Sequence, residues 1–161
     1  MNTTFLVPGQ EFAVLARDFC AWCESESLGP TPYRSAAGWL AKLYAAALIL
    51  PEVEPESAEP GPSAPPGAFD KAKRNLAPFW GQTYRQVFHP RPTNDDAPLL
   101  GDLGDDLTDV YSDIRGSLVL FEAGRTTEAV WQWRFDHETH WGQHAVGALF
   151  GIHHLYVSGL A

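Results

Sequence analysis

The sequence predicts an all-α protein, a single-domain bundle of about five helices with one proline-rich loop. Apolar residues recur at intervals of three and four in one segment after another, which is the spacing of a helix face. No segment shows an equally strong alternation of apolar and polar residues, so no strand is predicted. The 161 residues, 45% of them hydrophobic, suffice for one core, which predicts one domain over 1–161.

The first two helices are predicted from their apolar spacing and from the residues at their ends. The first covers about 10–26, with an apolar face of Phe12, Leu15, Ala16, Phe19 and Cys23. The second covers 32–50, with Thr31 as N-cap and Pro32 at the first helical position, where a missing N–H costs nothing. Pro51 ends it. Its apolar face holds Trp39, Leu40, Leu43, Tyr44, Ala47 and Leu48.

Two loops and a shorter helix are predicted in the middle of the chain. Residues 51–67 carry six prolines and four glutamates with little to bury, which predicts a mobile, solvated loop. A helical piece over about 69–88 is expected to break near Gly81. Residues 89–98, with three prolines, form the second predicted loop.

The next helix has the clearest boundaries. Asp102 is a typical N-cap and Gly124 a typical C-terminal residue. Between them runs an apolar stripe of Leu103, Leu107, Val110, Ile114, Leu118 and Phe121. Thr126 or Thr127 would then cap the last helix, over 128–156. That stretch holds three of the six tryptophans and five of the six histidines, with apolar residues on nearly every face, which predicts a buried central helix.

Charge and hydropathy exclude several classes of partner. Twenty acidic residues face eleven scattered basic ones, so no basic patch exists for a nucleic acid. The longest apolar run, Leu43 to Leu50, is far shorter than the roughly 20 residues of a membrane helix. Because the first residues also lack a charged and apolar signal segment, we expect a cytoplasmic protein without a membrane partner.

The last helix and the acidic helix before it carry a candidate site. On a helical wheel His140 and His144 share a narrow stripe with Trp133, and Asp136 could orient the ring of His140. The facing helix carries a column of carboxylates at Asp102, Asp106, Asp109 and Asp113. In an antiparallel pair the predicted ligands of a divalent metal are His140, His144, Asp109 and Asp113.

Structural interpretations of the same residues are favoured over a metal site. The helix dipole accounts for Asp105 and Asp106, and the acidic column fits a solvated face. His140 and His144 fit interface histidines that are hydrogen-bonded to a carboxylate or a carbonyl. The residues proposed to line a pocket, whatever its ligand, are Trp133, Arg134, Glu138, His140, Trp141 and His144. Of these, Arg134 and Glu138 fit a simple i,i+4 ion pair, and the tryptophans fit the core.

The two cysteines are predicted to be reduced core residues. Cys20 and Cys23 have the spacing of a redox pair, but they lie deep in an amphipathic helix, whereas redox pairs begin a helix that follows a strand. His153 and His154 point to different faces near a helix end and are expected at the surface.

Several short motifs together are typical of one family. They are Asp18-Phe19-Cys20 with Glu24, Leu43-Tyr44 with Leu50-Pro51, Val87-Phe88-x-Pro90, the run from Asp105 to Asp113, and above all Trp131-x-Trp133-Arg134-Phe135 running into Glu138-Thr139-His140-Trp141-Gly142-x-His144-Ala145. In these motifs the chain resembles the bacterial family catalogued as domain of unknown function 5063. The resemblance implies a small helical bacterial protein. Because the name of the family assigns no activity, no catalytic residue is carried over.

Two classes of function fit these observations. The first is a binding or regulatory module whose surface between the acidic helix and the last helix engages a partner protein or a small molecule of unknown identity. The second is a metal-dependent hydrolase whose divalent ion, held by the four predicted ligands, activates water. A homodimer packed through the stripe of Gly147 and Gly151 is compatible with either.

Overall fold

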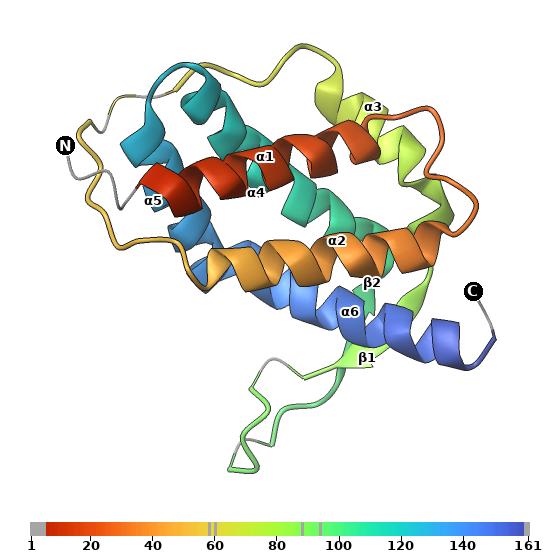
Figure 1. The fold of residues 1–161 in the computed structure, drawn as a ribbon. Coiled ribbons are helices and arrows are strands. Elements are labelled where there is room, and N and C mark those ends of the chain that lie inside the picture. The colour runs from red at the N-terminus through yellow and green to blue at the C-terminus, as the bar shows by residue number, and fades with distance from the viewer. Residues whose placement is uncertain (1–5, 58, 60, 88, 94, 160–161) are drawn as a thin grey trace.

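Six α-helices form a bundle in the computed structural model, which describes residues 6–57, 59, 61–87, 89–93 and 95–159 (Figure 1). Most of the bundle is therefore helical, as the sequence predicts. The elements, in chain order, are α1 (Leu6–Cys23), α2 (Pro32–Ala47), α3 (Ala68–Asn75), the 3₁₀ turn η2 (Ala77–Phe79), β1 (Thr83–Gln86), β2 (Leu99–Asp102), α4 (Leu103–Glu122), α5 (Thr126–Asp136), the π-helical turn η3 (His137–Trp141) and α6 (Gly142–Val157).

Helix α4 lies at the centre of the bundle. It packs against α1, α3, α5 and α6, and in Figure 1 it runs behind α1 through the middle of the molecule. Helix α4 takes this central position because its predicted apolar stripe is buried from Leu103 to Leu118. Its ends also form as predicted: the carboxylate of Asp102 accepts hydrogen bonds from the backbone N–H of Gly104 and Asp105, and Gly124 has a positive φ of 83° just beyond the last turn.

The C-terminal stretch differs from its prediction in two ways. It is not a single regular helix, because α5 and α6 are joined by the π turn η3. It is also not buried on all faces, since Val146 and Phe150 are 49% and 64% exposed. Apolar composition alone suggested a buried helix, but in the fold one of its apolar faces borders a groove instead of the core.

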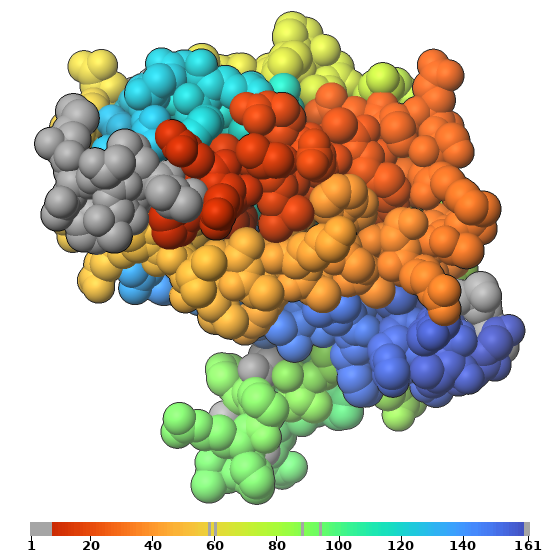
Figure 2. Space-filling model, in the orientation of Figure 1, coloured from red at the N-terminus to blue at the C-terminus, as the bar shows by residue number. Residues whose placement is uncertain are grey.

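A β-hairpin corrects the prediction that the chain has no strand. Strands β1 and β2 pair antiparallel, with Thr83 opposite Asp102 and Gln86 opposite Leu99. The predicted helix over 69–88 ends early because Pro78 and a positive φ of 80° at Gly81 interrupt it. Each strand has only four residues, too few to give a recognisable alternation. The hairpin projects from the body beside α6 (Figures 1 and 2); Phe88 lies outside the described residues.

The proline-rich segment has no helix or strand among its described residues before α3, as predicted. It is nevertheless tied to the bundle. The guanidinium of Arg125 donates to the backbone carbonyl oxygen of Glu59 at 3.0 Å, and Arg134 lies 3.9 Å from the carboxylate of Glu52. The segment therefore lies against the α4–α5 turn and α5 rather than extending freely into solvent.

The predicted caps of two helices are only partly correct. Thr31 occupies the N-cap position of α2 with Pro32 following it, but its side chain makes no capping hydrogen bond. Arg125, rather than either threonine, occupies the N-cap position of α5, also without a capping side-chain bond. Tertiary contacts of these helices thus set their start more than local capping does.

Both cysteines are buried and free, as predicted. Burial raises the pKa of the Cys20 thiol to about 12 and that of Cys23 well above its usual value. Because the thiolate is the reactive form, neither side chain is suited to redox chemistry or to metal binding. Among the described residues, no helix has the length and apolar character required to cross a bilayer.

Candidate metal centre

Two histidines of the C-terminal stretch face two aspartates of α4. The Nδ1 atom of His140 lies 2.7 Å from Oδ2 of Asp113, and Nδ1 of His144 lies 2.8 Å from Oδ1 of Asp106. The antiparallel packing of α4 against α5 and α6 creates these pairs, as the short turn between the helices predicts. The interpretation of these histidines as interface residues bonded to carboxylates is therefore correct as a description of their contacts.

The same two histidines converge with a third side chain. Asp109, His140 and His144 each offer one ligand atom, and the three atoms lie within 4.8 Å of one another. Oδ2 of Asp109 is 3.5 Å from Nε2 of His144, and the two imidazole rings are 4.8 Å apart. Because the Nδ1 atoms face carboxylates, Nε2 of each ring is the nitrogen left to bind a further group. Asp113 contacts a ring nitrogen instead of joining this set.

The π turn directs His140 toward α4 and keeps Trp133 and Trp141 together in the core. In a regular helix His140 would share the face of Trp133, as the helical wheel predicts. Instead Trp133 and Trp141, eight residues apart, are both fully buried, and the indole N–H of Trp141 donates to the carbonyl oxygen of Trp133 at 3.2 Å. The extra residue of the turn shifts the phase by about 100°. A side chain at Gly142 would collide with the carbonyl oxygen of His137.

Asp106 is a buried carboxylate beside the cluster, which its sequence context does not predict. The helix dipole explains it in the sequence, yet the residue is only 2% exposed and is not part of a solvated face. It accepts hydrogen bonds from the ring of His144 and, at 2.7 Å, from the hydroxyl group of Tyr84 in β1. A buried carboxylate with two donors is a strongly held group. In the sequence, the signal for Asp106 is its place in the carboxylate column with Asp109 and Asp113.

The stripe of Gly147 and Gly151 on α6 packs against the side chain of Tyr84 and not against a helix. A side chain at Gly147 would collide with the Tyr84 hydroxyl group, and one at Gly151 would lie 2.9 Å from its ring. The two glycines therefore allow another element to approach closely, and that element is a strand of the same chain. The face on which the homodimer hypothesis depends is occupied by this tyrosine.

Local electrostatics favour the protonated forms of His144 and Asp109 when no cation is bound. The hydrogen bond to Asp106 raises the pKa of His144 despite its partial burial. Burial raises the pKa of Asp109, and the neighbouring His144 offsets part of that rise. A divalent cation would replace these protons with a charge that all three groups attract.

Asp136 does not orient His140 as predicted. Its carboxylate accepts a hydrogen bond of 2.7 Å from the amide of Gln132, and Asp113 takes the place beside His140. Burial, together with the charge of Asp113, raises the pKa of Asp136 to about 6. The folded protein therefore holds a carboxylate at neutral pH in a place that disfavours its charge.

Replacing this carboxylate should stabilise the protein at neutral pH. Because the folded pKa of Asp136 lies above the unfolded value, its ionisation opposes folding above about pH 6, and this penalty fades as the pH falls toward 4. We expect Asp136→Asn, which keeps an acceptor for Gln132, to raise the free energy of unfolding by about 1 kcal/mol at pH 7 after allowance for its partial exposure. Urea unfolding in EDTA at pH 7 and pH 4 measures this.

The gain should disappear at pH 4, where Asp136 is protonated in the folded protein. Asp18→Asn, which changes an exposed carboxylate, is the matched control and should leave stability nearly unchanged at both values. A gain for Asp136→Asn that is equal at pH 7 and pH 4 would contradict the assignment.

The six residues proposed to line a pocket fall into three environments. Trp133 and Trp141 belong to the core. Arg134 and Glu138 form the predicted i,i+4 ion pair, with Nε and Oε1 2.9 Å apart. The remaining two, His140 and His144, face α4. The six residues therefore form three separate pairs and do not line one common cavity.

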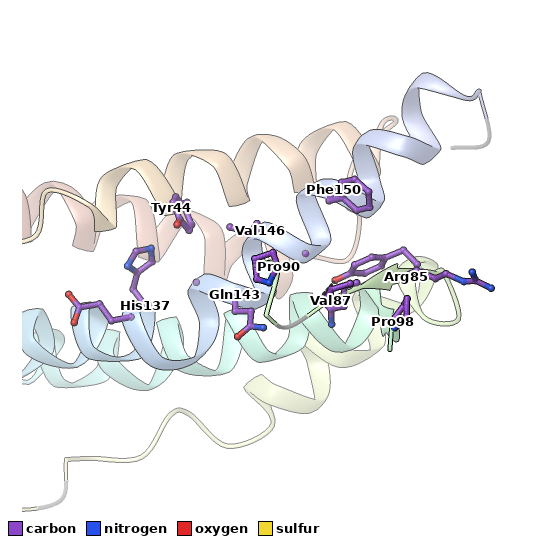
Figure 3. Close-up of a pocket in the computed structure, with 14 residues that line it drawn as sticks. Tyr44, Arg85, Val87, Pro90, Pro98, His137, Gln143, Val146 and Phe150 are labelled. Carbon is purple, nitrogen blue, oxygen red and sulfur yellow. Dashed lines mark hydrogen bonds between the residues drawn. The ribbon is translucent and has the colours of Figure 1, made fainter. Parts of the chain in front are cut away.

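A groove of about 730 Å³ lies between the hairpin and α6. Figure 3 shows Tyr44 and His137 toward one end and Val87 and Pro98 toward the other. The ring of His137 packs on Tyr44 at 4.7 Å and on Trp141 at 4.8 Å, and its burial lowers the pKa of the imidazole. Of the six residues proposed to line a pocket, only Glu138 borders this groove. The sequence does not predict the remaining residues of the groove, because it does not predict the hairpin that forms one of its walls.

Fold and site together define a small helical bundle with a two-histidine, one-carboxylate cluster between its central and last helices. The chain belongs to the family described as domain of unknown function DUF5063, whose model matches residues 8–158. It is also similar to a solved structure, that of protein BF1032 from Bacteroides fragilis, with 21% identity and a TM-score of 0.70 over 90% of this chain and 92% of that one. This likeness confirms the fold. No curated protein gives a significant match.

Proposed function

We propose that this protein is a metal-binding module whose divalent ion is held by Nε2 of His140, Nε2 of His144 and a carboxylate oxygen of Asp109. The observation that carries the proposal is the convergence of these three ligand atoms within 4.8 Å, with both rings already oriented by carboxylates. Metal-binding histidines characteristically donate their second ring N–H to a carboxylate or a carbonyl, which fixes the tautomer. In this arrangement Asp106 and Asp113 are the orienting groups.

The ligand set favours zinc, with manganese or iron as competing ions. Imidazole nitrogen suits zinc, copper, iron and nickel, whereas a single carboxylate with no further oxygen ligand suits magnesium or calcium poorly. Two buried thiols that are free and unreactive agree with a reducing compartment. The free thiols and the bacterial source of the similar structure support a location in the bacterial cytoplasm as part of this proposal.

A metal-dependent hydrolase is the second candidate function. Catalytic zinc sites use three protein ligands and leave a position for water, and this cluster offers three. The side chain of His140 is 49% exposed, so a substrate could approach the ion from solvent. Hydrolysis of a chromogenic ester or phosphoester by zinc-loaded protein, absent from His140→Ala, would support this candidate over a pure binding role.

Calorimetric titration of metal-free, untagged protein with zinc tests the proposal, together with elemental analysis after gel filtration. We expect one zinc per chain for the wild type and no stoichiometric zinc for His140→Ala or His144→Ala, because two ligands hold the ion weakly. His153→Ala, which removes an exposed histidine from the same helix, should bind like the wild type.

Circular dichroism must show that each variant remains folded. Cobalt provides a second readout, since its visible absorption depends on the type and geometry of its ligands. Failure of the wild type to bind zinc, manganese or iron at micromolar concentration would refute the proposal. So would binding that is equal in the wild type and both histidine variants.

A further inference from the structure

A chain of hydrogen bonds leads from the hairpin to the candidate ligands. The hydroxyl group of Tyr84 in β1 lies 2.7 Å from Oδ2 of Asp106, and Oδ1 of the same carboxylate lies 2.8 Å from Nδ1 of His144. From this geometry we propose that Tyr84 is a positioning residue of the metal site, so that the β1–β2 hairpin and the bound ion stabilise each other. The inference rests on the proposed function.

The direction of the hydrogen bonds follows from the chemistry of the three groups. A phenol has one proton to donate, and it donates to Asp106, an acceptor on both oxygens. Burial and this hydrogen bond both raise the pKa of Tyr84, so the phenol keeps its proton. The other oxygen of Asp106 accepts from Nδ1–H of His144. That tautomer places the lone pair on Nε2, the atom 3.5 Å from Asp109.

The position of Tyr84 is fixed on two sides by glycine. On α6 its ring lies over Gly147 and Gly151, where any side chain would collide with it or crowd it. Across the hairpin it is paired with Gly101, where a Cβ would lie 2.6 Å from Cζ of the tyrosine. The tyrosine ring therefore lies between the glycine backbones of α6 and β2, with its hydroxyl group against Asp106.

Linkage makes the effect reciprocal. If the hairpin favours the ring orientation that binds an ion, then the ion favours the docked hairpin by the same free energy. Tyr84 also borders the groove between the hairpin and α6, beside Gln86 and Val87. The shape of that groove thus depends on the same hydrogen bond that serves the metal site.

Zinc titration of Tyr84→Phe, which keeps the ring and removes only the hydroxyl group, tests the inference. We expect its zinc affinity to fall by about three- to tenfold, because loss of a group that orients a ligand directly typically costs 10–100-fold and Tyr84 acts one contact further away, through Asp106. Tyr44→Phe is the matched control, since Tyr44 borders the same groove from α2 and has no contact with Asp106 among the described hydrogen bonds. It should bind zinc like the wild type.

Amide hydrogen exchange supplies a readout that a merely structural role would not change. In the wild type, zinc should slow exchange across β1 and β2; in Tyr84→Phe this zinc-dependent slowing should be lost even when zinc is saturating. The melting temperature of Tyr84→Phe without zinc shows whether the substitution destabilises the fold itself, apart from its effect on zinc binding.

The outcomes distinguish the two proposals. A wild type that does not bind zinc overturns both. If the wild type binds zinc and Tyr84→Phe binds it equally, with the same zinc-dependent protection of the hairpin, the metal site stands and the role of Tyr84 is refuted.

Discussion

Zinc at one hundred times its dissociation constant is expected to stabilise the protein by about 2.7 kcal/mol, because an ion that binds only the folded state shifts unfolding by mass action. For a chain of this size the melting temperature should rise by about 5–10 °C. The expectation depends on ligands from two elements, Asp109 in α4 and His144 in α6, which the ion would hold together only in the folded protein. Thermal unfolding followed by circular dichroism, with and without zinc, measures the shift.

Addition of EDTA should reverse the stabilisation fully. His144→Ala should melt at the same temperature with and without zinc, whereas His154→Ala, an exposed histidine beyond the cluster, should keep the wild-type response. Equal shifts in both variants would mean that zinc binds elsewhere on the acidic surface.

Trp133→Ala is expected to lower the free energy of unfolding by about 3–5 kcal/mol, as truncation of a buried tryptophan usually does. Trp133 is fully buried between α1 and α4, with its ring 4.9 Å from Phe12 and 5.7 Å from Phe121. Its indole N–H also donates to the carbonyl oxygen of Ile114 at 3.3 Å, so the variant leaves a cavity and loses this hydrogen bond as well. Urea unfolding provides the measurement.

A neighbouring tryptophan gives the comparison for this variant. Trp131 stacks on Phe135, which is 44% exposed, at 4.9 Å. Because Trp131 is only partly buried, Trp131→Ala should cost about 1 kcal/mol, a small part of the loss at Trp133. Similar losses for the two variants would show that the buried contacts of Trp133 contribute little.

Much of the fold follows from local sequence signals. The length and ends of α4 are readable because its N-cap, its apolar stripe and its C-terminal glycine all indicate the same boundaries. The pairing of α4 with the last helix follows from the short turn between them, and it brings Asp109 and Asp113 close to the two histidines. These features depend on residues close in sequence or on one antiparallel contact.

The features that were missed depend on contacts between distant segments. The hairpin consists of two short strands whose pairing spans residues 83–102, and the π turn arises because Trp133 and Trp141 both find room in the core. Asp106 is held by hydrogen bonds from Tyr84 and His144, and neither is its neighbour in sequence. Helix periodicity places Asp106 in the carboxylate column, but it carries no information about the hairpin, the π turn or the contact with Tyr84.

The hairpin has a further consequence for the behaviour of the protein in concentrated solution. Within the part of the chain that the structure describes, the sheet has two strands and neither outer edge pairs with a further strand; Leu99 and Leu100 in β2 are 49% and 73% exposed. Such an edge is a template for aggregation through strand addition. Proline lacks the N–H that an added strand would need, and Pro98 directly precedes β2, so it limits the template at that end to the four residues of the strand. The strands are long enough to hold Tyr84 in place and too short to recruit other chains efficiently.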